Sequence, residues 1–220
     1  MDDENGLIVA EDVVEKENDQ EQLVPMLKQV EETLGEVAEE TLADGGYCSG
    51  QQLAEAEASG YEVLVNLGRH YVSGGFHASN FRYDEERDVC LCPLGKELTY
   101  ERTKASRHKT YEVRIYRCRS HGSCPMGKKC SRDKRGRSIE IGPYHQAMVR
   151  QREKPNRELL KRRPAIVERV FAQLKWNMNF RRWMVGGLEK VKAQWALLCT
   201  VYNLRKLCKL WTDGRLVLGP

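Results

Sequence analysis

Short apolar segments alternate with helical patterns over the first 66 residues, and this alternation constrains the fold more than any other feature of the chain. Residues 7–14, 41–44 and 61–66 are rich in β-branched and apolar side chains, which favours strands. Between them, residues 23–34 and 50–58 carry apolar side chains at helical spacing. Strand, helix, strand, helix, strand predicts an α/β fold with a mostly parallel sheet.

Residues that commonly start and end helices flank both predicted helices. Asn18 or Asp19 is placed to cap the first helix, and Gly35 is placed to end it. Pro25 must fall in the first turn or kink the helix, because proline has no N–H to donate. Ser49 is placed to cap the second helix.

Asp44 ends the second predicted strand and is followed at once by Gly45 and Gly46. Open α/β sheets place their chemistry at the carboxyl ends of parallel strands. The two glycines allow tight backbone geometry that leaves the carboxylate unobstructed, and Tyr47 can cover the turn. Two interpretations are open: Asp44 is a catalytic or metal-binding acid, or it is an ordinary helix cap.

A second isolated acid, Glu168, lies in a predicted helix over residues 164–175. Pro164 suits the first helical position, and Lys175 lies two turns after Glu168 on the same side. The apolar positions at helical spacing, which predict a buried face with the acid inside it, are Val167, Val170, Phe171 and Leu174. The alternative is a core helix whose glutamate reaches solvent at the edge of the buried stripe.

The charge of the chain is divided unevenly between its two parts. Residues 1–90 hold 22 acidic and 5 basic side chains, whereas residues 91–220 hold 10 acidic and 31 basic ones. A strongly basic segment suits a polyanion, since each Lys or Arg that meets a phosphate releases condensed counterions. Nucleic acid is therefore the predicted partner, against the alternative of an ordinary solvated charged surface.

Five cysteines fall within a segment of altered composition, residues 81–141. Thiolates grouped in this way can surround Zn²⁺ tetrahedrally, although the spacing is not the paired CxxC of most zinc sites. The predicted ligands are Cys92, Cys118, Cys124 and Cys130, with Cys90 or His121 as substitutes. Reduced structural thiols are the alternative.

Basic residues suited to DNA phosphates accompany these cysteines and follow the Glu168 helix. Lys128, Lys129 and Arg132 begin a basic cluster in the cysteine segment. Arg181 and Arg182 lie between aromatic residues, an arrangement that suits phosphate contact and base stacking, although the aromatics can equally be core.

Further elements complete the predicted organisation. Residues 111–117 alternate like an exposed strand, residues 144–163 are basic and helical, and residues 188–211 form a last helix with a wide apolar face. Three parts are expected: a partial α/β core over 1–80 ending in a Gly- and Ser-rich linker, a Cys-rich basic insertion over 81–142, and a helical part over 143–220 that completes the core.

The runs LADGGYCSG, KRRPAIVERVFAQLKWNMNFRRW and GGLEKVKAQWALLCTVYNLRKL closely resemble the catalytic half of the RNase H-like DDE transposases of bacterial insertion sequences. In that family an Asp, a small residue, Gly and Tyr after a short strand carry the second catalytic acid, which matches Asp44. The third acid is a helical Glu with an Arg before it and a Lys seven residues after it, which matches Glu168, Arg163 and Lys175. A Tyr usually precedes that Arg by three residues, and here the position is Leu160.

This resemblance implies a DNA-cleaving and DNA-joining chemistry. In the family, the acids bind two Mg²⁺ ions that activate a water or a 3′-hydroxyl for attack on a phosphodiester. Asp44 and Glu168 would be magnesium ligands, and Arg163 and Lys175 would contact phosphates near the scissile bond. Members generally act as multimers on the paired ends of the mobile element, so DNA and further copies of the chain are the implied partners.

The first catalytic Asp of the family has no counterpart in this sequence. In the family that Asp lies on the first strand of the sheet, whereas the opening of this chain resembles the third strand, and Asp2, Asp3 and Asp12 are poor replacements. The expectation is an N-terminally truncated transposase, inactive alone, unless a further N-terminal segment or another polypeptide supplies the first strands.

Two other functions remain as alternatives: a non-catalytic DNA-binding protein derived from a transposase, and a zinc-ribbon interaction module. No stretch is long and apolar enough to cross a membrane, and the N-terminus is acidic rather than signal-like. The predicted location is cytoplasmic and, through DNA, nucleoid-associated.

Overall fold

A computed structural model describes residues 1–68, 74–105, 111–155 and 157–216. The chain divides into two compact units. Unit 1 comprises Met1–Asn66 and Lys154–Pro220, and unit 2 comprises Leu67–Glu153. Part of the predicted linker, residues 69–73, falls outside the described residues. No helix in the described ranges is long and apolar enough to span a bilayer.

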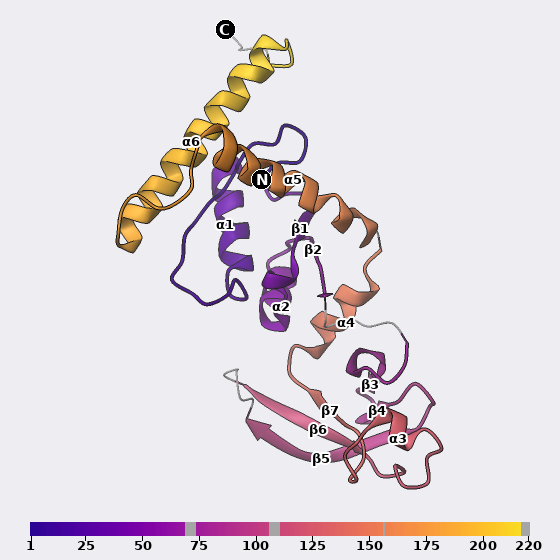
Figure 1. Cartoon of the computed structure of the whole chain (residues 1–220). Helices are drawn as coiled ribbons and strands as arrows, with labels where there is room; N and C mark the ends of the chain where they lie inside the picture. The colour runs from indigo at the N-terminus through magenta and orange to yellow at the C-terminus, as the bar shows by residue number, and fades with distance from the viewer. Residues whose placement is uncertain (69–73, 106–110, 156, 217–220) are drawn as a thin grey trace. The chain divides into compact units, whose positions relative to one another are not determined.

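Unit 1 contains a small parallel sheet that confirms the predicted alternation of strands and helices over residues 41–66. β1 (Thr41–Ala43) pairs in parallel with β2 (Val63–Val65), and α2 (Gly50–Ala58) connects them. All three residues of β2 are buried. Figure 1 shows α1 (Leu23–Leu34) and α2 on one side of this pair of strands. The result is a mixed α/β architecture.

The outer edge of β2 is covered by basic side chains. Lys154 Nζ donates to the carbonyl of Val63 at 2.9 Å, and Arg157 Nη2 donates to the carbonyl of Val65 at 2.9 Å. These side chains donate hydrogen bonds to backbone carbonyls at the sheet edge, which a neighbouring strand would otherwise satisfy.

Helix α1 ends as predicted but begins differently. Gly35 adopts a left-handed conformation, φ 74°, and its N–H bonds to the carbonyl of Glu31. The N-cap is Gln22 and makes no side-chain cap bond, so the prediction of Asn18 or Asp19 is wrong. Asn18 Oδ1 instead accepts the N–H of Gln20, because a side-chain turn forms before the helix starts.

Ser49 is the N-cap of α2, as predicted, but its side chain makes no cap hydrogen bond. Its backbone carbonyl accepts the N–H of Leu53 at 2.9 Å and so starts the helix.

The segment 7–14 is not a strand, contrary to the prediction from its composition. The backbone N–H and carbonyl of Ile8 bond to the side-chain amide of Asn203, at 2.9 and 2.8 Å. β-branched residues favour extended backbone, but a strand also needs a neighbouring strand, and here a helix side chain takes that place.

The C-terminal helices of unit 1 share a small core. α5 (Arg163–Ala172) continues into a π-helical turn over Gln173–Asn177, and α6 (Leu188–Thr212) lies against α5 (Figure 1). Val170, Leu174 and Tyr202 form the buried centre of this contact. Phe171, predicted in the buried face, is 47% exposed. On α6, Leu197, Val201 and Leu204 are also exposed.

The predicted helix over 144–163 is divided into two. α4 (His145–Glu153) precedes Pro155, and a 3-10 turn (Arg157–Lys161) follows it. Proline lacks the N–H that would continue the helix and disfavours helical backbone in the residue before it.

Unit 2 is built on a five-stranded antiparallel meander in the order β3-β4-β5-β6-β7. Its strands are β3 (Arg82–Asp84), β4 (Val89–Leu91), β5 (Glu97–Ala105), β6 (Glu112–Cys118) and β7 (Ser138–Ile141). A short helix, α3 (Gly127–Cys130), lies between β6 and β7 in sequence. The core consists of Phe81, Cys90, Leu98, Tyr116, Ile139 and Ile141.

The segment 111–117 was predicted as an exposed strand, and the structure corrects this. β6 pairs with β5 on one side and β7 on the other, and Val113, Ile115, Tyr116 and Arg117 are buried. The alternation of polar and apolar residues predicts that one face of the strand is solvated. Arg117 is nevertheless buried, because acidic side chains pair with it.

Candidate active site and cysteine cluster

Asp44 follows β1 directly and uses its two carboxylate oxygens differently. Oδ1 accepts the N–H of Gly46 at 2.8 Å and so caps the 3-10 turn Gly45–Tyr47. Oδ2 accepts from Arg163 Nη2 at 3.0 Å. A Cβ on Gly46 would lie 3.0 Å from Asp44 Oδ1, so a side chain at this position would crowd the carboxylate. The prediction of a cap is therefore confirmed, and the role of Asp44 as a catalytic or metal-binding acid stays a prediction.

Arg163 is the first residue of α5 and meets Asp44 across 119 positions of sequence. The Arg163 side chain is 22% exposed and the Asp44 side chain is 45% exposed. Nearby, burial raises the pKa of Tyr47, and the charges of Asp19 and Asp44 raise it further. The fold thus brings together the two motifs that contain the predicted acids.

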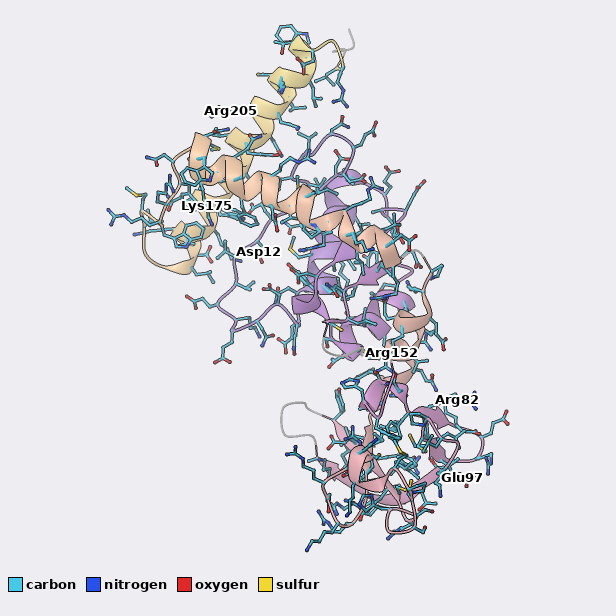
Figure 2. All side chains as sticks on the ribbon, turned by 45° about the vertical axis from the view of Figure 1, so that its right-hand side comes forward. Asp12, Arg82, Glu97, Arg152, Lys175 and Arg205 are labelled. Atoms are coloured by element: carbon cyan, nitrogen blue, oxygen red, sulfur yellow. The ribbon has the colours of Figure 1, made fainter. Side chains whose placement is uncertain are left out.

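Glu168 is exposed, which corrects the prediction that it lies inside the buried face of its helix. A helical residue turns by about 100° per position, so Glu168 lies about 200° from the buried Val170. Lys175 is also exposed, in the π-helical turn after α5 (labelled in Figure 2). The Glu168 carboxylate and Lys175 are therefore both open to a ligand in solvent.

The structure does not assemble a complete metal site around these acids. Within the described ranges, no three His, Cys, Asp or Glu side chains are arranged to hold a metal ion. Asp2 accepts backbone N–H groups of Glu4 and Asn5. Asp3 pairs with Arg162, and Asp12, labelled in Figure 2, pairs with Lys192 at 2.9 Å.

The donor chemistry at Asp44 nevertheless fits a hard cation. Its Oδ2 already faces a positive group, the Arg163 guanidinium, and almost half of the side chain is open to solvent. Carboxylate oxygens are the ligands that Mg²⁺ prefers. Asp44 and Glu168 would supply two such groups.

A cationic and aromatic surface follows α5. Arg181 and Arg182 are exposed, as expected for groups that contact phosphate. The guanidinium carbon of Arg181 lies 4.5 Å from the centroid of the Trp176 ring. Trp176 is 72% exposed, and sequence reasoning did not select it. In the sequence, the feature that could have identified Trp176 as a functional residue was its position next to Lys175.

The neighbouring aromatics are partly packed together. The Phe180 and Trp183 rings lie 5.1 Å apart, and Trp183 lies 6.1 Å from Trp195 of α6. Trp183 is still 42% exposed. Phe180 and Trp183 therefore pack with Trp195, and a base-stacking role for the exposed part of Trp183 stays a prediction.

In unit 2, the predicted phosphate contacts and the cysteines occupy the same segment. Lys128, Lys129 and Arg132 are exposed on and after α3. The four predicted zinc ligands, together with His121, line one cavity of about 20 Å³: Cys92, Cys118, Cys124 and Cys130. Figure 2 shows yellow sulfur atoms close together inside the unit that carries the labels Arg82 and Glu97. Cys90 lies instead in the hydrophobic core, where burial raises the pKa of its thiol to about 12.

Comparison with known proteins gives one assignment. The family model described as transposase DDE domain matches residues 91–208, more than half of the chain. This match includes Glu168, Arg163 and Lys175, whereas Asp44 lies before it. Neither the curated proteins nor the solved structures include a match. The chain therefore belongs to the transposase DDE domain family.

Proposed function

We propose that the chain takes part in metal-dependent cleavage and transfer of DNA strands during transposition of an insertion sequence. The observation that carries this proposal is the ion pair between Asp44 at the end of β1 and Arg163 at the start of the Glu168 helix. It joins two motifs that are far apart in sequence into one surface of unit 1. This surface would form part of an RNase H-like core in which β1 and β2 are outer strands.

Mg²⁺ would be held by Asp44 and Glu168 and would supply Lewis-acid activation of water or a 3′-hydroxyl. The role of Arg163 is to neutralise Asp44 in the absence of other cations. With Asp44 bound to Mg²⁺, the Arg163 guanidinium would be free to bind a DNA phosphate, with which it can form two parallel hydrogen bonds. Lys175 would add a second positive charge along the same side of the helix.

The two acids do not suffice, and we propose that a third carboxylate comes from another polypeptide segment. Within the described residues, no further acid is placed with Asp44 or Glu168 to complete a site of three carboxylates. The chain by itself would then bind DNA without cutting it. Paired copies at the two ends of the element are the assembly that the family implies, and binding to DNA would place the chain at the nucleoid.

Plasmid nicking tests the catalytic proposal. The purified chain is incubated with supercoiled plasmid and Mg²⁺ or Mn²⁺, with and without an added first-strand segment from a related transposase that carries its acid. We expect no nicking by the chain alone and nicking by the mixture. Asp44→Asn and Glu168→Gln should each abolish nicking, because each removes a metal ligand, whereas Glu189→Gln, an exposed acid at the start of α6, should not.

Nicking that persists in both Asp44→Asn and Glu168→Gln would refute the catalytic roles. A mixture that binds DNA but never cuts would favour the second candidate, a non-catalytic DNA-binding protein. That candidate is supported by the same ion pair, since an Asp44 carboxylate neutralised by Arg163 needs no metal.

Replacing Trp176 with Ala is expected to weaken binding to single-stranded DNA about tenfold, because base stacking on an exposed aromatic contributes about 1–3 kcal/mol. Arg181 lies over the same ring and would pair with the phosphate next to the stacked base. Fluorescence anisotropy with a labelled oligonucleotide measures the change. The control is Trp211→Ala, a tryptophan that is 60% exposed near the end of α6. If the two variants bound the oligonucleotide with equal affinity, Trp176 would not be part of the DNA-binding surface.

A further inference from the structure

We propose that Cys92, Cys118, Cys124 and Cys130 bind one structural Zn²⁺ ion that fastens the turn after β4 to the segment between β6 and β7. This inference is independent of DNA cleavage. It rests on four observations in unit 2: a shared cavity, a hydrogen-bonded turn around Cys92, a buried unpaired nitrogen of Arg137, and close backbone approach at two glycines.

The four thiols come from separate parts of the chain but line the same small cavity. Its volume of about 20 Å³ has room for about one atom, since a single water needs about 10–15 Å³ by this measure. A closed site for one ion with four sulfur ligands and no open position is the arrangement of structural zinc. As the structure places them, no three of these thiols are arranged to hold an ion. Binding therefore requires the cysteine side chains to rotate towards the centre of the cavity, where each sulfur would lie about 2.3 Å from the ion.

The turn around Cys92 holds its sulfur in place. The N–H of Cys92 bonds to the carbonyl of Lys96 at 2.9 Å, and the N–H of Gly95 bonds to the carbonyl of Cys92 at 2.8 Å. Within this turn, Cys92 Sγ accepts the N–H groups of Leu94 and Lys96, at 3.4 and 3.3 Å. Such hydrogen bonds hold a sulfur in one position, as outer-shell donors do for the ligands of a metal.

Arg137 supplies positive charge at the same cavity. Its guanidinium lines the cavity, and its Nε is buried without a hydrogen-bond partner. A buried donor of this kind is costly unless something accepts from it. Four thiolates around Zn²⁺ carry a net charge of about −2, so a sulfur next to Arg137 would provide the missing acceptor.

The segment after β6 folds tightly enough to bring its cysteines together. A Cβ on Gly127 would lie 2.6 Å from the carbonyl oxygen of His121, and a Cβ on Gly136 would lie 2.4 Å from the carbonyl oxygen of Cys118. Only glycine permits these approaches.

The structure also narrows the ligand set. Cys90 belongs to the core cluster with Leu98 and Tyr116, so it is unsuited to replace Cys92. His121 lines the cavity but contacts the position of Gly127, where its Nδ1 would lie 3.3 Å from an added Cβ. The four thiols are therefore the assigned ligands, and His121 packs beside them.

Metal analysis of the purified full chain tests the proposal. We expect one Zn²⁺ per chain by atomic emission, and expect Co²⁺ replacement to give the visible bands of tetrahedral cobalt with strong thiolate charge-transfer absorption in the near ultraviolet. Cys92→Ser and Cys124→Ser should each lose most of the bound metal. The controls, Cys208→Ser at an exposed position of α6 and His121→Asn, should keep it.

Each other outcome decides against the assignment. Zinc content well below one per chain, with no cobalt bands, would show that the thiols are only structural. Loss of metal in His121→Asn would show that the His121 imidazole is a zinc ligand in place of one of the four thiols. The cobalt spectrum of the parent chain counts thiolates by its charge-transfer intensity, so the question is answered even if a serine variant fails to fold.

Discussion

Replacing Arg117 with Met is expected to destabilise unit 2 by about 3 kcal/mol, because it leaves a partly buried acid without its counter-charge. The Arg117 side chain is 5% exposed. Its Nε donates to Glu101 Oε1 at 2.8 Å, and its Nη1 donates to the carbonyl of Gly136 at 3.0 Å and to Asp133 Oδ2 at 3.4 Å. The other oxygen of Glu101 is buried without a hydrogen-bond partner, and the exposed Arg102 approaches it only to 3.8 Å, so the remaining site could not be solvated easily.

The two units permit a measurement that separates their stabilities. All four tryptophans lie in unit 1, whereas β5 and β6, which carry Glu101 and Arg117, lie in unit 2. Arg117→Met should speed hydrogen exchange of the β5 and β6 amides, measured by mass spectrometry, and leave the denaturant midpoint of tryptophan fluorescence unchanged.

A matched arginine and a second substitution control for this result. Arg102 also lies near Glu101, at 3.8 Å, but is 55% exposed, so Arg102→Met should change stability by less than about 1 kcal/mol. Adding Glu101→Gln to Arg117→Met should recover part of the loss, because it removes the unpaired charge. Equal protection in Arg117→Met and Arg102→Met would contradict the proposed role of burial.

Acidification from about pH 4 to pH 2 is expected to destabilise unit 2 in part through Asp88. Tyr116 Oη donates to this carboxylate at 2.6 Å, Arg114 Nη2 at 2.6 Å and Tyr83 Oη at 2.8 Å. These donors, Tyr116 first, lower the pKa of Asp88 to about 2. A lowered folded-state pKa gives stability that is fully present above the ordinary value near 3.8 and is lost as the pH falls through about 2.

The difference between the parent chain and Asp88→Asn isolates this contribution. Asp88 adopts φ 51°, a left-handed conformation that Asn also tolerates, so the substitution changes charge with little backbone strain. Glu101 and Asp133 also have lowered pKa values, chiefly through Arg117 and Arg135, but they are common to both proteins. The parent should have the larger free energy of unfolding at pH 7, and the difference between the two proteins should decrease towards pH 2. A difference that is independent of pH would exclude the charge of Asp88 as its source.

The sequence alone determined the elements whose signals are local. The helices α1, α2, α5 and α6 are recognisable because a helix makes its hydrogen bonds four residues apart, so periodicity and Gly35 or Pro164 report it directly. The position of Asp44 at the end of a strand and the family motifs around Glu168 were likewise readable, since each lies within one short run of residues.

Tertiary structure decided what depends on contacts distant in sequence. Residues 7–14 look like a strand, but strand formation needs a partner, and Asn203 provides the hydrogen bonds instead. The pairing of Asp44 with Arg163 is invisible in sequence because 119 positions separate them. Burial of Arg117 follows from Glu101 on the neighbouring strand, and the separation of Cys90 from the other thiols follows from core packing. A polar side chain is buried or exposed according to the partners that the fold brings to it, and local pattern does not contain those partners.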